Sequence, residues 1–447
     1  MRFHLFPCVP SYPPGLIPGG KNQYRKVIYI SPTGNDSNSG LSPGSAKKNI
    51  SVSAGGESGG TTFVLMQGTH APTTSWQMNA SGTALEPISI IADPAAPAGT
   101  VILDGNSLGS AVDQLIVGGA HIFIQGIKFY RGKKHALSIY GSTFTNVTVT
   151  GCTFEDAWES GILAQNTVPG RTSAVYAYSN VIRHCIKKNE VSTGADSWGS
   201  ALKFIELSGG VMAYNTVEEN WGEGLNFISC INGHCYGNTA RDNWSVNIYC
   251  DNSQTVWIHN NRAWCTSDAN GQRFWKTYPT RLAGATTGEY PATNIQIGSE
   301  FASVTQRVTR DIWIKGNVCA DGTRGFCAQT YTSGPPPAAV RHFVNIIVEE
   351  NTFRGSVNDI FFASDNAGDG GSLLPNSGCI MRNNVLVNSG AALTATIPTG
   401  WTSGENVFNG VTARGWASST DRDIDAGISS TPPGSISPAD NYLPVAS

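Results

Sequence analysis

Two acidic residues near the middle of the chain, Glu223 and Asp251, are of the type that cleavage of a glycosidic bond requires. Such cleavage uses two carboxyl groups, one with a raised pKa that donates a proton and one that stays ionised. Tryptophans flank Glu223 in the sequence pattern, and aromatic walls that exclude water would raise its pKa. We expect Asp251 near water on the next strand, as base or nucleophile. The alternative is that Glu223 binds a corner amide and Asp251 caps the turn at Asn252–Ser253.

Lys203, Tyr249 and Arg273 offer a different chemistry in the same region. A polysaccharide lyase needs a base for the sugar C5 proton and a cation to neutralise the uronate carboxylate. These three residues could fill those roles, so lyase and hydrolase chemistry both stay open. The further residues predicted to bind substrate are Trp198, Trp221, Trp244, Asn226, Asn247, Gln296 and Trp275.

A repeat in the sequence must position these residues. Segments such as VTVTGCTF (147–154), GVMAYNTV (210–217) and TVWIHNNRA (255–263) alternate apolar with polar residues and then turn at a polar residue. Short strands with a minimum repeat of 22 or 23 residues predict a coil that stacks on itself at about 4.8 Å per rung. We expect the turn residues to form a hydrogen-bonded, purely structural ladder. They are Cys152, Asn180, Asn215, Asn238, Asn261, Asn317, Asn351, Asn384 and Asn406.

A second strand after each turn brings the candidate residues together. Its first inward residues are Ile162, Leu202, Leu225, Ile248, Ile295, Phe326 and Ile360. The next position points outward, so stacking should align Lys203, Asn226, Tyr249 and Gln296 on adjacent rungs. Two positions further on, Asp251 shares the same outer face. Glu223 lies at the corner before its strand, and Glu206 and Glu300 lie where theirs end.

Four tryptophans recur four positions before these inward residues, at Trp158, Trp198, Trp221 and Trp244. One interpretation is a ladder of rings that fills the corner of the coil. The other is a platform for sugar rings.

Insertions are predicted on both edges of the same outer face. Residues 185–197 and 264–293 lengthen the corner before the second strand, and residues 330–341 and 364–376 lengthen the corner after it. Long loops in a compact fold are commonly functional, so we expect them to wall in a groove. The 264–293 insertion, which carries Arg273 and Trp275, should lie over the strands of Lys203, Asn226 and Tyr249.

Several stretches resemble the right-handed parallel β-helix superfamily of pectate lyases, polygalacturonases, alginate lyases and phage tailspikes. They are YISPTGNDSNSGLSPGSAKKNI (29–50), FVLMQGTH (63–70) and EPISIIADP (86–94) with VILDG (101–105). The resemblance implies an all-β solenoid of about ten or more coils over residues 27–410. Residues 1–26 would form an N-terminal extension or cap, and residues 411–447 a C-terminal cap or tail. The paired-Asp rung of polygalacturonases is absent.

This resemblance implies an enzyme that cleaves a polysaccharide, as a lyase or a glycoside hydrolase. The alternative is a non-catalytic glycan-binding or receptor-binding protein, such as a phage tailspike. No cofactor is required for either, although calcium is common in pectate-lyase-like sites. The run from Asp365 to Asp369 does not have the spacing of an EF-hand loop, and we interpret it as a turn.

The composition of the chain argues against nucleic acid and membranes as binding partners. A net charge of -3 and a pI near 6.2 provide no basic field for nucleic acid, and no apolar run reaches the length of a membrane span. The ten cysteines form no paired CxxC set, and we expect Cys152, Cys250 and Cys319 to be buried free thiols. No signal peptide is recognisable at the N-terminus, so we expect cytoplasmic synthesis and a virion-associated or extracellular destination by another route. Assembly into an oligomer stays open.

Overall fold

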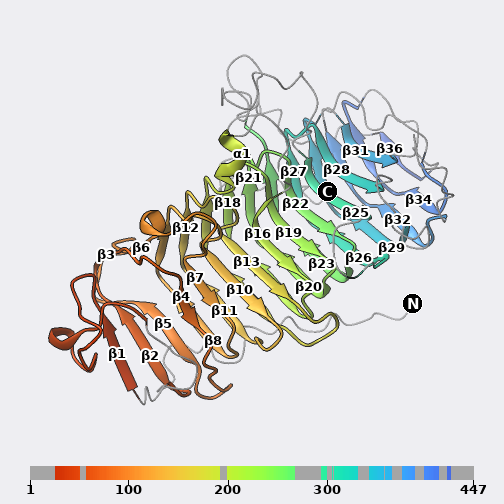
Figure 1. The fold of residues 1–447 in the computed structure, drawn as a ribbon. Coiled ribbons are helices and arrows are strands. Elements are labelled where there is room, and N and C mark those ends of the chain that lie inside the picture. The colour runs from red at the N-terminus through yellow and green to blue at the C-terminus, as the bar shows by residue number, and fades with distance from the viewer. Residues whose placement is uncertain are drawn as a thin grey trace.

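Three parallel sheets of short strands run along one axis in the computed structural model, from the red N-terminal end to the blue C-terminal end (Figure 1). The structure describes residues 26–50, 57–191, 199–266, 293–299, 305, 307–330, 342–356, 358–364, 375–387, 397–411 and 420–423. Each coil contributes one strand to each sheet, and every strand pairs with its counterpart in the next coil. This confirms the predicted all-β solenoid.

The described part of sheet A has 13 strands. They are β1 (Lys26–Ile30), β2 (Thr61–Leu65), β5 (Ile88–Ala92), β8 (Ile122–Gln125), β11 (Val147–Thr150), β14 (Val175–Tyr178), β17 (Gly210–Ala213), β20 (Ile231–Tyr236), β23 (Gln254–His259), β26 (Thr309–Lys315), β29 (Phe343–Glu349), β32 (Cys379–Arg382) and β34 (Trp401–Gly404).

The described part of sheet B has 10 strands, which include the strands predicted to carry the site. They are β4 (Trp76–Met78), β7 (Leu115–Val117), β10 (Leu137–Gly141), β13 (Ile162–Asn166), β16 (Ser200–Ile205), β19 (Glu223–Ile228), β22 (Val246–Asp251), β25 (Thr293–Ser299), β28 (Arg324–Thr330) and β31 (Asn358–Ser364).

Sheet C has 13 described strands, and its last pair extends the coil beyond residue 410. They are β3 (Gly68–His70), β6 (Val101–Asp104), β9 (Lys128–Tyr130), β12 (Thr153–Glu155), β15 (Val181–Arg183), β18 (Thr216–Glu218), β21 (Thr239–Arg241), β24 (Arg262–Trp264), β27 (Val318–Ala320), β30 (Thr352–Arg354), β33 (Val385–Val387), β35 (Val407–Asn409) and β36 (Arg422–Asp423). The short helices are α1 (Lys187–Val191), η1 (Pro43–Ser45) and η2 (Gly105–Ser107).

The predicted Asn ladder stands at the corner between sheets A and C. The side-chain amide of Asn215 donates to Asn238 Oδ1 at 3.0 Å, and that of Asn238 donates to Asn261 Oδ1 at 2.9 Å. Each Oδ1 also accepts the backbone N–H of the preceding Asn. The same bonds continue through Asn317, Asn351, Asn384 and Asn406. The ladder therefore satisfies buried corner backbone that strand pairing leaves without partners.

The residue before each Asn of this ladder explains why the chain bends there. Tyr214, Asn260 and Glu350 all have φ between 54° and 56°, in the left-handed region. Glycine occupies the equivalent position at Gly237 and Gly316, where this conformation carries no Cβ penalty. A single left-handed residue turns the strand sharply, and the buried Asn that follows holds the turn.

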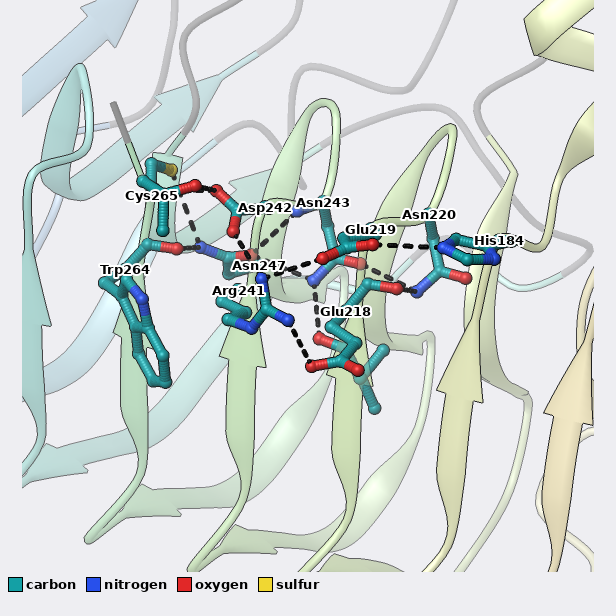
Figure 2. Close-up of polar contacts among 12 residues, drawn as sticks. His184, Glu218, Glu219, Asn220, Arg241, Asp242, Asn243, Asn247, Trp264 and Cys265 are labelled. Carbon is teal, nitrogen blue, oxygen red and sulfur yellow. Dashed lines mark hydrogen bonds and ion pairs between the residues drawn. The ribbon is translucent and has the colours of Figure 1, made fainter. Parts of the chain in front are cut away.

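A second Asn ladder stands at the corner between sheets C and B (Figure 2). Asn220 donates to Asn243 at 2.8 Å, Asn243 to Asn247 at 2.9 Å, and Asn247 to Asn294 at 3.0 Å. Beside it, Arg241 binds the carboxylates of the two acidic residues Glu218 and Glu219. This corner fixes the start of each sheet B strand.

A short segment after β25 lies against the ends of three sheet B strands. Thr305 donates its backbone N–H to Glu206 Oε1 at 2.9 Å and accepts from Ser229 Oγ at 3.0 Å. The Asn252 amide donates to the carbonyl of Arg307 at 2.8 Å. Glu206, noted in the sequence at a strand end, thus secures this segment as part of the scaffold.

The interior is continuous and apolar, with isoleucine, valine and phenylalanine stacked in columns along the axis. Cys152, Cys250 and Cys319 lie buried in it as free thiols, as predicted. Burial raises the pKa of Cys152 to about 12, which keeps its thiol protonated. Among the described helices, none has the length and apolar character needed to cross a membrane.

Candidate functional site

The outer face of sheet B collects the residues predicted from the repeat. Lys203 pairs with Asn226, Asn226 with Tyr249, and Tyr249 with Gln296, on the four adjacent strands β16, β19, β22 and β25. The predicted register is confirmed, because a slip of one residue would have turned these side chains into the core. We call these four residues the central column.

Glu223 is held beside this column by two side chains. Ser200 Oγ donates to Glu223 Oε2 at 2.5 Å, and Asn226 Nδ2 donates to the same oxygen at 2.6 Å. Glu223 is 4% exposed. Burial raises its pKa, although the Lys203 ammonium and the two hydrogen bonds act in the opposite direction. Its partners are therefore side chains of the outer face, and the predicted direction of its pKa shift is confirmed.

Lys203 lies at the electrostatic centre of the site. Burial lowers the pKa of Lys203, and the nearby Lys188 ammonium lowers it further. The carboxyl groups of Glu223, Glu159 and Asp251 oppose this shift and raise its pKa. One ammonium thus interacts electrostatically with three carboxyl groups.

Sequence reasoning missed His135, Glu159 and Lys188, which extend the site towards the N-terminal coils. Glu159 binds His135 Nε2 at 3.1 Å and Lys188 Nζ at 2.9 Å. The Ser160 N–H donates to His135 Nδ1 at 3.2 Å, so Nε2 carries the proton of the neutral ring. Burial lowers the pKa of His135 to about 4. Lys188 lies in the predicted 185–197 insertion, and that position was the available signal.

Asp251 lies on the same outer face but is buried, at 1% exposed, which corrects the prediction that it lies near water. The segment around Arg307, bonded to the adjacent Asn252, closes over this end of the strand. Asp251 pairs with Gly298 of the next strand. A Cβ on Gly298 would lie 2.3 Å from the Tyr249 hydroxyl, so the phenol occupies the space above the glycine, next to Asp251.

The described tryptophans of the predicted column differ in exposure. Trp221 and Trp244 are 5% and 2% exposed, and Trp221 belongs to the apolar core. Their burial agrees with the interpretation of a ladder that fills the corner, and their role in substrate binding stays a prediction. Trp158, at 41% exposed, offers its ring to solvent.

Two of the predicted polar contacts also have protein partners. Asn247 belongs to the second Asn ladder and donates to the Trp264 carbonyl at 3.1 Å, so its amide serves the corner. Its role in substrate binding stays a prediction. Gln296 is 3% exposed and donates to Gln329 Oε1 at 3.4 Å, on the outer face.

The remaining predicted residues lie outside the part of the chain that the structure describes. They are Trp198, Arg273, Trp275 and Glu300, with most of the insertions 264–293, 330–341 and 364–376. The run from Asp365 to Asp369 lies there as well. Within the described residues, no three His, Cys, Asp or Glu side chains come together as a metal site would need.

Comparisons with known proteins agree with the coiled architecture. The family of the right handed beta helix region matches residues 97–271. The GH136 lacto-N-biosidase from Eubacterium ramulus is similar in structure, with a TM-score of 0.53 and 12% identity over 89% of this chain and 66% of its own. The Dettilon tailspike protein is similar with a TM-score of 0.51 and 13% identity, over 86% of this chain and 68% of its own.

None of the curated proteins matches the sequence significantly. At these identities the structural likeness concerns the fold alone, and this chain covers slightly less than two thirds of the lacto-N-biosidase. The matched family, the stacked coils and the three parallel sheets agree with one another. The chain has the fold of a right-handed parallel β-helix.

Proposed function

We propose that this protein cleaves glycosidic bonds of a polysaccharide on the outer face of sheet B, with Glu223 as the proton donor. One observation carries the proposal: Glu223 is a buried carboxyl group on that face whose pKa is raised by burial. A raised pKa increases the protonated fraction of the carboxyl group, as a general acid requires. Ser200 and Asn226 fix its orientation.

Asp251 is the second carboxyl group of the proposed pair. The Glu223 carboxyl is bonded to Asn226, while Asp251 lies one rung further and two residues further along the strand. A rung of about 4.8 Å and two residues of about 3.3 Å each separate the strand positions of Asn226 and Asp251 by about 8 Å. Inverting glycosidases place a water molecule between carboxyl groups about 6.5–9.5 Å apart. Because the Glu223 carboxyl accepts a hydrogen bond from Asn226, the gap between these two positions supports Asp251 as the base that activates water.

A lyase is the second candidate, and Lys203 favours it. Burial lowers the pKa of this lysine, which raises the fraction of neutral amine able to remove a sugar C5 proton. Tyr249, next but one in the central column, could then return a proton to the leaving oxygen. A lacto-N-biosidase and a tailspike protein are among the similar structures. Glycan binding without cleavage is the outcome that would replace both candidates.

The test is turnover on a panel of neutral and acidic polysaccharides, measured by reducing ends and by the ultraviolet absorbance of unsaturated uronates. The first signal alone indicates hydrolysis, and both together indicate a lyase. Glu223→Gln and Asp251→Asn keep the shape of each side chain and should each lower turnover at least about 100-fold. Glu350→Gln is the matched control, since Glu350 is half exposed and remote from sheet B. Wild-type turnover in both site variants would refute the proposal and favour Lys203 as base.

A further inference from the structure

Asn226, in the middle of the central column, leaves one buried polar atom without a partner. Its amide nitrogen donates to Glu223 Oε2 at 2.6 Å and to Ser200 Oγ at 3.3 Å. Its Oδ1 has no hydrogen-bond partner among the residues that the structure describes, and the side chain is 2% exposed. Buried carbonyl oxygens almost always accept a hydrogen bond, so an orphan acceptor at a site indicates a donor supplied by a ligand.

The position of this acceptor ties it to the proposed chemistry. Asn226 is bonded to the same Glu223 oxygen as Ser200, and its strand neighbours are Lys203 and Tyr249. A ligand group that donates to Asn226 Oδ1 would therefore lie beside the proposed proton donor. The sugar unit at the cleaved bond is the part of a glycan that can reach this position.

The charges around the acceptor indicate which sugars suit it. The Lys203 ammonium is already under the electrostatic influence of the carboxyl groups of Glu223, Glu159 and Asp251. Lys188, a second cation near Lys203 among the described residues, forms an ion pair with Glu159 at 2.9 Å. A uronate carboxylate would have to compete with these groups for either lysine, and it would also meet the lone pairs of Asn226 Oδ1. Hydroxyl and amide N–H groups meet no such repulsion and can donate to it.

We propose that Asn226 Oδ1 accepts a hydrogen bond from a hydroxyl or amide N–H of an uncharged sugar at the cleaved bond, so that the substrate is a neutral glycan. This inference rests on the proposed function and makes it more specific. Asn226 then has two roles: its amide nitrogen donates a hydrogen bond to Glu223, and its Oδ1 accepts the hydrogen bond that selects the sugar.

Matched polysaccharides test the choice of substrate. Polygalacturonate and alginate are each offered beside their carboxyl-reduced, neutral forms, together with neutral glucans, galactans and N-acetylated glycans. Binding is measured by calorimetry with the full-length Glu223→Gln variant, so that cleavage does not consume the ligand. We expect neutral glycans to bind at least about tenfold more tightly than carboxylated ones. Preference for the carboxylated member of a pair would overturn the inference.

Variants at the same position test the role of the acceptor. In the Glu223→Gln background, Asn226→Ala should weaken binding of the preferred neutral glycan about tenfold, the fold-change for one hydrogen bond. Asn226→Asp retains an acceptor oxygen and should recover most of the affinity. Asn106→Ala, at an exposed asparagine of η2 four coils before β19, is the control and should leave affinity unchanged. Circular dichroism checks that each variant remains folded.

The outcomes separate this inference from the proposed function. Unchanged affinity in Asn226→Ala would overturn the inference alone, while a loss of turnover in Glu223→Gln would still support the proposed function. Tight binding of a neutral glycan that the wild-type protein does not cleave would overturn the proposed function. If no polysaccharide binds, both are wrong.

Discussion

Replacing Gly298 with alanine tests whether the polar face of sheet B works as a positioned site. The new Cβ would lie 2.3 Å from the Tyr249 hydroxyl oxygen and 2.9 Å from its Cζ atom. The phenol must therefore move by about 1 Å to reach ordinary van der Waals contact. Tyr249 is only 3% exposed, so its neighbours must move with it. Overpacking of this kind costs about 1–3 kcal/mol of folding free energy.

The larger effect should be on turnover. A displacement of about 1 Å at a reacting centre can lower the rate about 100-fold. We expect Gly298→Ala to lower kcat by that order while the urea midpoint falls only modestly. In a Tyr249→Phe background the 2.3 Å contact with the oxygen is gone and the 2.9 Å contact with Cζ remains, so the added effect of Gly298→Ala should be smaller. Gly44→Ala is the control, because a Cβ there meets no atom within 4 Å. Unchanged kcat in Gly298→Ala, or fully additive effects of the two variants, would refute the reasoning.

Two further predictions concern stability. Asn238→Ala should lower the free energy of unfolding by about 2–5 kcal/mol, because it removes the acceptor of the Asn215 N–H and the donor to the Met212 carbonyl, both of which are buried. Urea denaturation measures this change. A loss below about 1 kcal/mol would contradict the role of the ladder. Because the pKa of Glu223 is raised, the folded state favours the protonated carboxyl group. The stability that this protonation contributes is complete below the ordinary pKa of Glu. It is lost as the pH rises through the folded-state pKa of Glu223. Wild type should therefore lose stability relative to Glu223→Gln between acid and neutral pH, and parallel pH profiles of the two urea midpoints would show the assignment to be wrong.

The coil and its register could be predicted because they depend on local rules. A strand with period 2 that ends at a left-handed residue followed by Asn can be recognised in each coil separately. Stacking then aligned Lys203, Asn226, Tyr249 and Gln296 without any knowledge of long-range contacts. The same reasoning explains why the Asn ladder was predicted as structure and not as a set of ligands.

The surroundings of the site could not be predicted in this way, because they depend on side chains from distant parts of the sequence. Asp251 is buried near a segment that returns from residues 305–308, more than 50 residues later. His135 reaches the site from two coils earlier through Glu159. The structural role of Asn247 could not be predicted either, because its hydrogen bonds to Asn243 and Asn294 cross a corner of the fold.

The fold separates the elements that provide stability from those that provide chemistry. Asn ladders and apolar columns hold the corners and the interior, and they impose no residue type on the outward positions of sheet B. Those positions can therefore carry a buried carboxyl group such as Glu223 and an unsatisfied acceptor such as Asn226 Oδ1, both of which reduce stability. The second Asn ladder anchors the start of the same strands, so this local loss does not have to loosen the site. Rigid strands that carry unfavourable polar groups at aligned positions are what a preorganised binding or catalytic site requires.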